Sequence, residues 1–290
     1  MYVKLYQEPA LSNPVMIAGW SGIGGVGVIA VDTIRLATVA EKFAEIAPRT
    51  FGVPFMPSSA GSGFLKHADF PTNSFYFHST PQRDLIFFVG QACPRSVPRI
   101  YESGKLVLDI AERFQCKKIY VAGATVSRVH HTTTPKVQAV TNQDSLMDEV
   151  RSFPNTTPRS TADTDASHRQ DLFGLYNVVL EDAKRRGVDC ICLLGEIPMY
   201  VSRFPNTPYP KASRPIVQVL TTTLGIELDL AQFDDLILPL EDNINKWVEK
   251  LPPMLKAEID KLRDAAQVSD PITEEDKQRI MEDIDRFFKQ

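Results

Sequence analysis

The sequence predicts an α/β protein in three layers, with a mostly parallel central sheet flanked by helices. Two observations predict this class. Short, continuously apolar runs alternate with segments in which apolar residues recur at helical spacing. In addition, each clear apolar run ends at or beside a glycine, where a chain can turn tightly from a strand into a helix. The chain has 290 residues, 43% hydrophobic and 23% charged, which is enough for one large domain or two small ones.

Four apolar runs are the predicted core strands, because they are too continuously apolar for a sheet edge that faces water. They cover residues 14–20, 84–90, 118–124 and 188–195. Helical periodicity predicts helices over residues 28–43, 101–114, 172–186 and 214–224. Residues 51–77 are rich in proline, glycine, serine and aromatic residues, so we expect short strands and turns there.

The regular pattern is lost over residues 126–167. Prolines, threonines and polar residues in 151–167 predict a mobile surface segment. From Asp229 onward the chain again has helical periodicity, and the Ser269-Asp270-Pro271 break predicts a hinge between two C-terminal helices. We therefore expect an α/β core domain over residues 1–235 and a C-terminal helical extension over 236–290.

Charge and composition exclude several classes of protein. Lys and Arg number 32 and Asp and Glu 36, and the formal charge of −4 argues against nucleic acid as the partner. No apolar run approaches the roughly 20 residues that span a bilayer, and the N-terminal residues do not resemble a signal peptide. We expect a cytoplasmic protein without a membrane partner. The four cysteines fit no disulfide framework or zinc pattern, so we expect no metal site and no cofactor.

A glycine-rich turn is the strongest local motif. Gly22, Gly24 and Gly27 have the G-x-G-x-x-G spacing after a predicted strand and before a predicted helix. Such a turn directs backbone N–H groups and a helix N-terminus to one point, which suits an anion. The expected second strand ending in Asp or Glu is missing, because residues 42–47 are short and run into Pro48. Three interpretations of this turn stay open. In order of preference they are a tightly packed turn, a phosphate or carboxylate site, and a dinucleotide site.

Ligands of parallel sheets bind at the carboxyl ends of the strands, which nominates the loops at 19–27, 90–98, 123–134 and 195–209. His130 and His131 are adjacent, and on an extended segment they would point to opposite faces and could not easily bind one metal. His131 is a candidate general base or ligand contact, or else a hydrogen-bonded loop histidine. Glu196 is the best candidate acid, and it could also cap a helix or pair with an arginine. We expect Gly22, Gly24, His131 and Glu196 to lie near one another.

Several motifs together resemble the proteasome assembly chaperone 2 family. They occur in order over about residues 10–250: the strand at 14–20 with its glycine turn, then 43–46, 84–90, 119–123 and His131-Thr132. The most specific part is 184–189 followed by Cys192-Leu193-Leu194-Gly195-Glu196, Pro198 and Tyr200, and residues 224–230 match the lead into the C-terminal helices. The candidate ligand- or anion-binding residues are then Gly22, Gly24, Gly27, His131, Thr132, Glu196 and Tyr200, with no catalytic residue assigned.

The resemblance implies a fold similar to purine nucleoside phosphorylases and a non-catalytic assembly factor, since characterised relatives help to assemble proteasome α-subunits. The alternative is a binder of, or enzyme for, a nucleoside, phosphate or carboxylate at the strand ends. The sequence departs from the family at Thr133, where relatives carry Arg, and at residues 169–174, where they often carry a glycine-rich turn. It ends Phe288-Lys289-Gln290, with Lys where docking relatives carry Tyr.

The resemblance also implies a homo-oligomer, with a trimer as the first expectation. Independent support comes from an apolar stripe over residues 244–262, with apolar residues three and four apart, and from a second stripe over 280–288. Each stripe either folds back on its own domain or packs against another subunit or protein. Folding back is the preferred interpretation, because most amphipathic helices do so.

Overall fold

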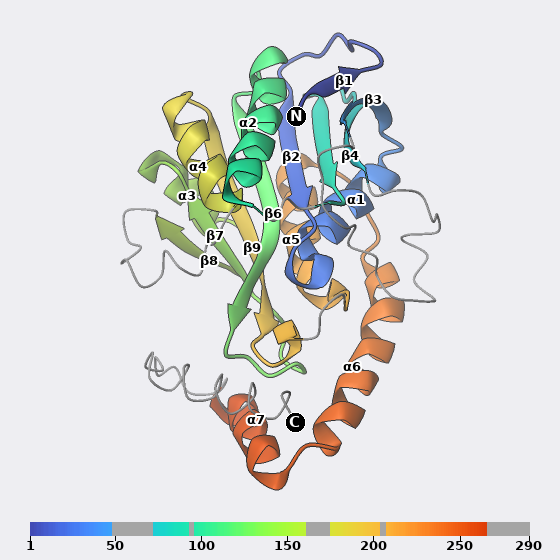
Figure 1. Cartoon of the computed structure of the whole chain (residues 1–290), viewed down its shortest axis with the longest axis vertical. Coiled ribbons are helices and arrows are strands. Elements are labelled where there is room, and N and C mark those ends of the chain that lie inside the picture. The colour runs from blue at the N-terminus through green and yellow to red at the C-terminus, as the bar shows by residue number, and fades with distance from the viewer. Residues whose placement is uncertain (48–71, 93–95, 161–174, 204–206, 266–290) are drawn as a thin grey trace.

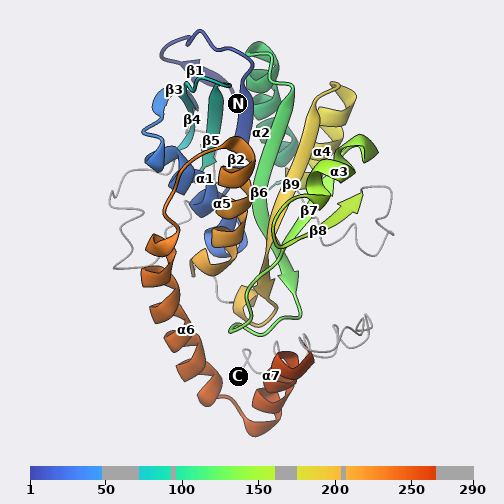
Figure 2. The same ribbon diagram turned by 180° about the vertical axis from the view of Figure 1, so that it is seen from behind.

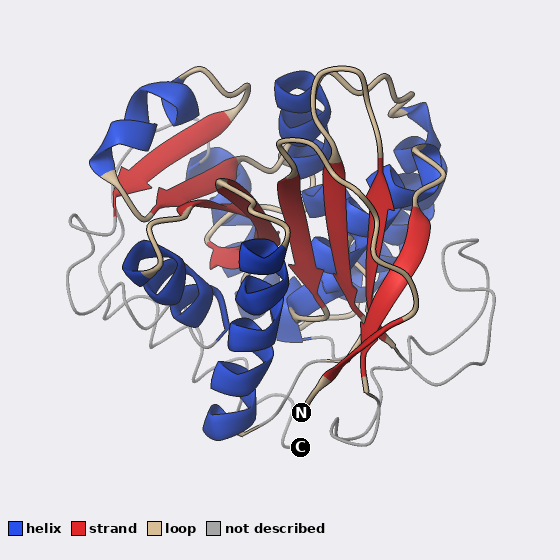
Figure 3. Cartoon of the chain, turned by 90° about the horizontal axis from the view of Figure 1, so that it is seen from above, coloured by secondary structure: helices blue, strands red, loops and turns tan. Residues whose placement is uncertain are grey.

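A computed structural model describes residues 1–47, 72–92, 96–160, 175–203 and 207–265 of the chain (Figure 1). Its described strands form one nine-stranded sheet, in the order β1-β3-β4-β5-β2-β6-β9-β7-β8. Helices cover both faces of this sheet (Figure 3). The predicted α/β class is confirmed.

The four predicted core strands form the parallel centre of the sheet. They are β5 (Leu85–Gly90), β2 (Val15–Trp20), β6 (Lys118–Ser127) and β9 (Asp189–Pro198). Val15 pairs in parallel with Leu85 on one side and with Lys118 on the other. Their carboxyl ends therefore lie at one edge of the sheet, as expected.

The flanks of the sheet make it more mixed than the sequence predicted. On one side β4 (Asn73–His78), β3 (Glu41–Ile46) and β1 (Val3–Leu5) follow in antiparallel pairs, and on the other β7 (Val137–Thr141) is antiparallel to β9. The outermost strand, β8 (Thr156–Ser160), is parallel to β7. Parallel pairing is thus confined to the centre and to this edge.

Two expectations about regular structure were wrong. The helix expected over 28–43 is α1 (Val26–Ala37), which ends before Val39, where a φ of 53° turns the chain toward β3. The stretch 126–167, expected to be irregular, contains β7, α3 (Met147–Arg151) and β8. Strand β8 contains Pro158, which an edge strand tolerates. Its residues show no alternation of apolar and polar side chains, so the sequence pattern did not predict a strand there. Residues 161–167 lie outside the described residues.

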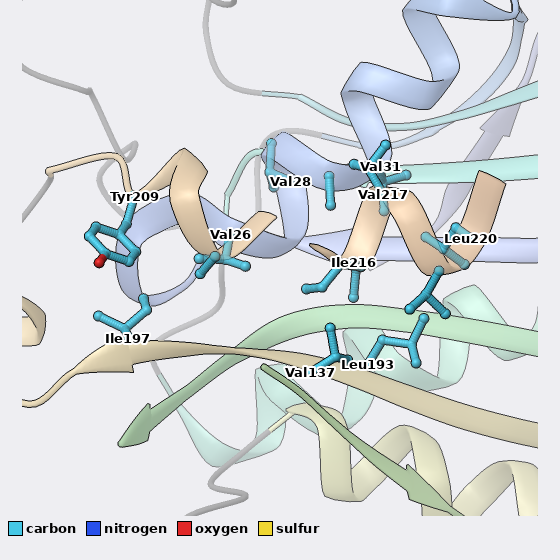
Figure 4. Packing of buried hydrophobic residues seen from close by; sticks show 14 of the residues in the cluster. Val26, Val28, Val31, Val137, Leu193, Ile197, Tyr209, Ile216, Val217 and Leu220 are labelled. Atoms are coloured by element: carbon cyan, nitrogen blue, oxygen red, sulfur yellow. The ribbon is translucent and has the colours of Figure 1, made fainter. Parts of the chain in front are cut away.

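Two helical layers bury the two faces of the sheet. One core contains α1 and α5 (Pro210–Leu224), the other α2 (Val97–Arg113) and α4 (Leu175–Arg185). Helix α5 begins four residues earlier than expected, with a proline at its first position. Figure 4 shows Leu193 and Ile197 of β9 facing Val26 of α1 and Ile216 of α5.

Two further helices, α6 (Asp234–Glu249) and α7 (Pro253–Ala265), follow the sheet and the short helix Ala231–Phe233. Helix α6 runs down beside the molecule and α7 turns back beneath the ends of β6 and β9 (Figures 1 and 2). The apolar residues of 244–262 therefore lie on two helices rather than on one. The break between the helices includes Pro252, and a proline lacks the N–H that a helix interior needs. The break expected at 269–271 and the stripe at 280–288 lie outside the described residues.

The described part of the C-terminal stripe folds back on its own chain. Its buried side chains join the apolar core on the α1 and α5 face: Ile244, Val248, Leu251, Ile259 and Leu262. This is the preferred of the two interpretations of that stripe. The division of the chain into a 1–235 domain and a 236–290 extension stays a prediction.

Candidate functional site

The glycine turn joins β2 to α1 through a short 3-10 helix, Ile23–Gly25. Gly24 and Gly25 have φ values of 63° and 60°, in the left-handed region that favours glycine. A Cβ on Gly24 would lie 2.9 Å from the side chains of Ile197 and Tyr209, and a Cβ on Gly27 would lie 2.2 Å from the carbonyl oxygen of Ala122. The backbone of Tyr209 also donates to the Gly24 oxygen at 2.8 Å. Close packing thus accounts for Gly24 and Gly27.

The strand that follows α1 argues against a dinucleotide fold. In that fold the first helix leads to a parallel strand next to the first one. Here α1 leads to β3, which β4 and β5 separate from β2 and which pairs antiparallel with both of its neighbours. The tight-turn interpretation and an anion site at Gly22 remain.

His131 is buried and belongs to a network of hydrogen bonds beneath α6. Its backbone N–H donates to the Tyr200 hydroxyl at 2.8 Å, its Nδ1 lies 2.6 Å from the same hydroxyl, and its Nε2 lies 2.8 Å from Oδ1 of Asn245. Because Asn245 Oδ1 only accepts, Nε2 carries the proton and the Tyr200 O–H donates to a bare Nδ1. Burial, and to a lesser degree the nearby Lys211 ammonium, holds the pKa of His131 below its usual value, so the ring is neutral.

His130 stacks beside His131, which corrects the expectation of opposite faces. The ring centroids are 4.1 Å apart, because the segment is a turn closed by the Thr133 N–H donating to the His130 oxygen at 2.9 Å. His130 Nδ1 lies 2.7 Å from the hydroxyl of Thr132, and Nε2 lies 3.4 Å from the Arg263 guanidinium of α7. Burial first, and then the neighbouring charges, lowers the pKa of His130 to about 4.

A partly buried ion pair completes this cluster. The Lys211 ammonium, at the start of α5, donates both to the carbonyl oxygen of His131 and to the carboxylate of Glu241 on α6. The Tyr200 ring stacks on Trp247, with centroids 6.3 Å apart. Burial raises the pKa of Tyr200 well above its usual value, so this hydroxyl stays protonated.

Glu196 is separated from this cluster by the sheet. On β9, Ile191, Leu193 and Ile197 join the core beneath α1 and α5, whereas Cys190, Cys192 and Leu194 join the opposite core. Because strand side chains alternate, Glu196 points to the face away from α5. There it accepts from the Lys136 N–H at 3.0 Å and from Ser127 at 3.3 Å, so it ties β9 to the neighbouring strand ends.

The strand-end edge thus holds the predicted residues in separate groups. Gly24 packs with Tyr209; His131, Thr132 and Tyr200 share the histidine cluster; Glu196 lies across the sheet. Gly22 faces the α4 side, where an added Cβ would lie 3.4 Å from the hydroxyl of Tyr176. The sequence analysis did not predict a role for Lys211, Glu241, Asn245 and Arg263. These residues lie on helices, and the pattern of a helix does not indicate which loop the helix packs against.

Neither a metal-binding cluster nor a membrane-spanning helix occurs in the part of the chain that the structure describes. That part contains no cluster of three His, Cys, Asp or Glu side chains able to hold a metal ion. None of its helices is both long and apolar enough to cross a membrane.

Comparison with known proteins identifies the family. The family model described as "PAC2 family" matches residues 16–248, which is most of the chain. The chain belongs to the PAC2 family. This confirms the resemblance that the strand-end motifs indicated. An uncharacterized protein, MJ1210, of Methanocaldococcus jannaschii is 23% identical over 257 residues, covering 86% of this chain and 88% of the relative.

Solved structures confirm the fold of this PAC2 protein. PbaB of Pyrococcus furiosus, an archaeal proteasome activator, has a TM-score of 0.66 at 24% identity, covering 84% of this chain and 97% of that one. PbaA of the same organism, an archaeal homolog of proteasome-assembly chaperone, has a TM-score of 0.60 at 18% identity, covering 85% of this chain and 96% of that one. At these identities the likeness is one of fold.

Proposed function

We propose that this PAC2 protein is a non-catalytic, homo-oligomeric interaction factor of the cytoplasm that acts on proteasome subunits. The proposal rests on how the polar side chains at the carboxyl ends of the strands are hydrogen-bonded. His131, Tyr200 and Glu196, the polar residues best suited to chemistry there, bond to groups of the chain itself. A ligand would have to displace those groups, whereas a protein-binding function leaves them in place. Membership of a family with proteasome-associated relatives supplies the partner class.

The partner is tested by capture with a named target. The full chain, immobilised, is expected to retain proteasome α-subunits of the source cell, identified by mass spectrometry, at salt concentrations that remove weakly bound proteins. A matched column carrying bovine serum albumin is the control. Capture of other proteins alone, with α-subunits demonstrably present in the lysate, would contradict the proposal.

The oligomer is tested separately by light scattering on the full chain at micromolar concentration. We expect a mass of about three subunits, in line with the family resemblance; another multiple would keep the oligomer and correct the trimer. Assembly through the C-terminal helices is tested by deleting residues 270–290. A folded monomer would support an interface there, and loss of folding would show that this segment completes its own domain. A monomeric full chain ends the oligomer proposal.

A second function is favoured by one feature, the turn at Gly22 before the N-terminus of α1. Backbone N–H groups at such a turn suit the phosphate or carboxylate of a small ligand, a nucleoside monophosphate included. Calorimetric titration with inorganic phosphate and with adenosine monophosphate tests this alternative, with Asn243→Ala, at an exposed position of α6, as a control away from the turn. Binding that Gly22→Val abolishes and the control keeps would favour it.

A further inference from the structure

The C-terminal helices are attached to the rest of the molecule by side chains. We call residues 234–265, which contain α6 and α7, the strap. Among the described residues no backbone-to-backbone hydrogen bond joins the strap to the sheet or to α1–α5. Its polar links to the body include His131 with Asn245, His130 with Arg263, Lys211 with Glu241 and, at the first turn of α6, Arg214 with Asp234 at 3.9 Å. Three of these links meet at the histidine pair.

Around the two histidine rings, the charged groups of the described residues are paired with one another. The groups that face the two rings come from the strand ends and from all three helices packed there: Tyr200, Lys211 of α5, Glu241 of α6, and Asp260 and Arg263 of α7. The Glu241 carboxylate pairs with Lys211, and Asp260 lies 3.4 Å from Arg263. A proton on either buried imidazole would add a third cation to a junction whose two carboxylates already have partners.

The hydrogen bonds also require neutral rings. Nδ1 of His131 accepts from the Tyr200 hydroxyl, which already accepts the backbone N–H of His131. A proton on Nδ1 would turn that acceptor into a second donor and leave the Tyr200 O–H without its partner. Nε2 of His130 faces the Arg263 guanidinium, which only donates, so this nitrogen can accept but not donate.

We propose that the strap is a pH-sensitive latch, and that proton uptake by the His130–His131 pair detaches residues 234–265 from the strand ends while the sheet stays folded. The latch is independent of the proposed partner, because its contacts lie within one chain. Its apolar residues, such as Ile244 and Leu262, supply affinity for the body, and the histidine pair makes that affinity depend on pH.

The sign follows from proton binding. In the docked strap the pKa of His130 is about 4 and that of His131 is also lowered, whereas both exposed rings would return to about 6.5. The detached form therefore binds more protons below pH 6.5. Docking is at full strength above about pH 6.5 and weakens as the pH falls toward 4. Each pKa unit of difference shifts the docking equilibrium about tenfold.

Hydrogen exchange on the full chain, analysed by mass spectrometry and corrected for intrinsic exchange rates, tests the latch between pH 8 and pH 5. We expect protection of residues 234–265 to fall at least about tenfold, while β2, β6 and β9 keep theirs. Trp247 should lose its stacking on Tyr200 over the same range, measured as a shift of its fluorescence in a Trp20→Phe background.

Variants separate protonation from mere loosening. The double variant His130→Gln, His131→Gln cannot take up the protons, so strap protection should no longer change with pH. Should that variant fail to dock, Arg263→Gln removes one facing cation and should shrink the pH response. Lys256→Gln, at an exposed position of α7, should keep the wild-type response. Equal strap protection at pH 8 and pH 5, a wild-type response in the double variant, or simultaneous loss from strap and sheet would overturn the proposal.

Discussion

At the scale of single residues, two buried tyrosines differ in how their hydroxyl groups are satisfied. The Tyr200 hydroxyl bonds to both the backbone N–H and the Nδ1 of His131. The Tyr209 hydroxyl is buried, and no described residue offers it a hydrogen bond. A buried hydroxyl without a hydrogen bond destabilises a fold. When a hydrogen-bonded hydroxyl is removed, its former partners become the unsatisfied buried groups, and they destabilise the fold in the same way.

Matched tyrosine-to-phenylalanine substitutions therefore have opposite expected effects. Tyr200→Phe should lower the free energy of unfolding by about 1–3 kcal/mol, because it leaves an N–H and a ring nitrogen of His131 unpaired. Tyr209→Phe should be neutral or stabilise by up to about 1 kcal/mol. Urea denaturation of both variants at pH 7.5 measures the difference. Equal losses for the two would mean that packing, rather than hydrogen bonding, distinguishes these rings.

The same residues mark the limit of the sequence prediction for the site. His131 and Glu196 were predicted because each was expected to follow a core strand, although Glu196 lies within β9, and Tyr200 was predicted from the family resemblance. The alternation along β9 could have placed Glu196 on the opposite face, since Gly195 and Ile197 face α5. The links to Asn245 and Arg263 could not be predicted, because nothing in a helix's own periodicity says which loop it covers.

At the scale of elements, two buried asparagines extend the sheet beyond its strands. Asn142, just after β7, donates its side chain to the Val188 oxygen and accepts from the Cys190 N–H, both at 2.9 Å. Asn73 at the start of β4 makes the same pair of bonds to the backbone of Ala92, both at 3.0 Å. Each side chain thus donates one hydrogen bond to, and accepts one from, the neighbouring backbone, as a further paired residue of the strand would do.

Removing the amide of Asn142 should loosen the junction of β7 and β9. Asn142→Ala leaves a buried carbonyl and a buried N–H without partners, so we expect a loss of about 2–4 kcal/mol in the free energy of unfolding. Asn243→Ala, on an exposed turn of α6, provides the control and should change it by less than about 0.5 kcal/mol. Thermal unfolding followed by circular dichroism measures both, and a loss under 1 kcal/mol at Asn142 would contradict this role.

The elements themselves were predicted where local pattern decides them. The four parallel core strands are apolar on both faces, and their signal is strong. Strand β7 was missed although Val137–Thr141 contains apolar residues. Strand β8 was missed because Thr156–Ser160 contains a proline and few apolar residues, and its strand form depends on pairing with β7. The helix was predicted to extend to residue 43 because apolar residues after α1, Phe43 of β3 included, occur at helical spacing from those of α1.

At the scale of the whole molecule, we propose that residues 1–235 form a domain without the strap, since the sheet is covered on both faces by α1, α2, α4 and α5. A chain ending at residue 235 should therefore remain folded, with the far-ultraviolet spectrum of a sheet protein. It should bind the dye ANS more strongly than the full chain, because Tyr200 and its apolar neighbours lose their cover. Loss of cooperative unfolding in this truncated chain would mean that residues 1–235 are not a domain by themselves.

The strand order has a consequence for synthesis on the ribosome. Strand β2 lies in the middle of the sheet, and its partners β5 and β6 are encoded long after it. At roughly 5–20 residues per second, residues 15–20 wait about 5–20 s before residue 118 is made and both edges can be satisfied. All six residues of β2 are buried in the finished protein. The nascent chain thus carries an apolar segment that lacks one or both of its partner strands until β6 has been made. General chaperones that bind extended apolar peptides would find their first target there.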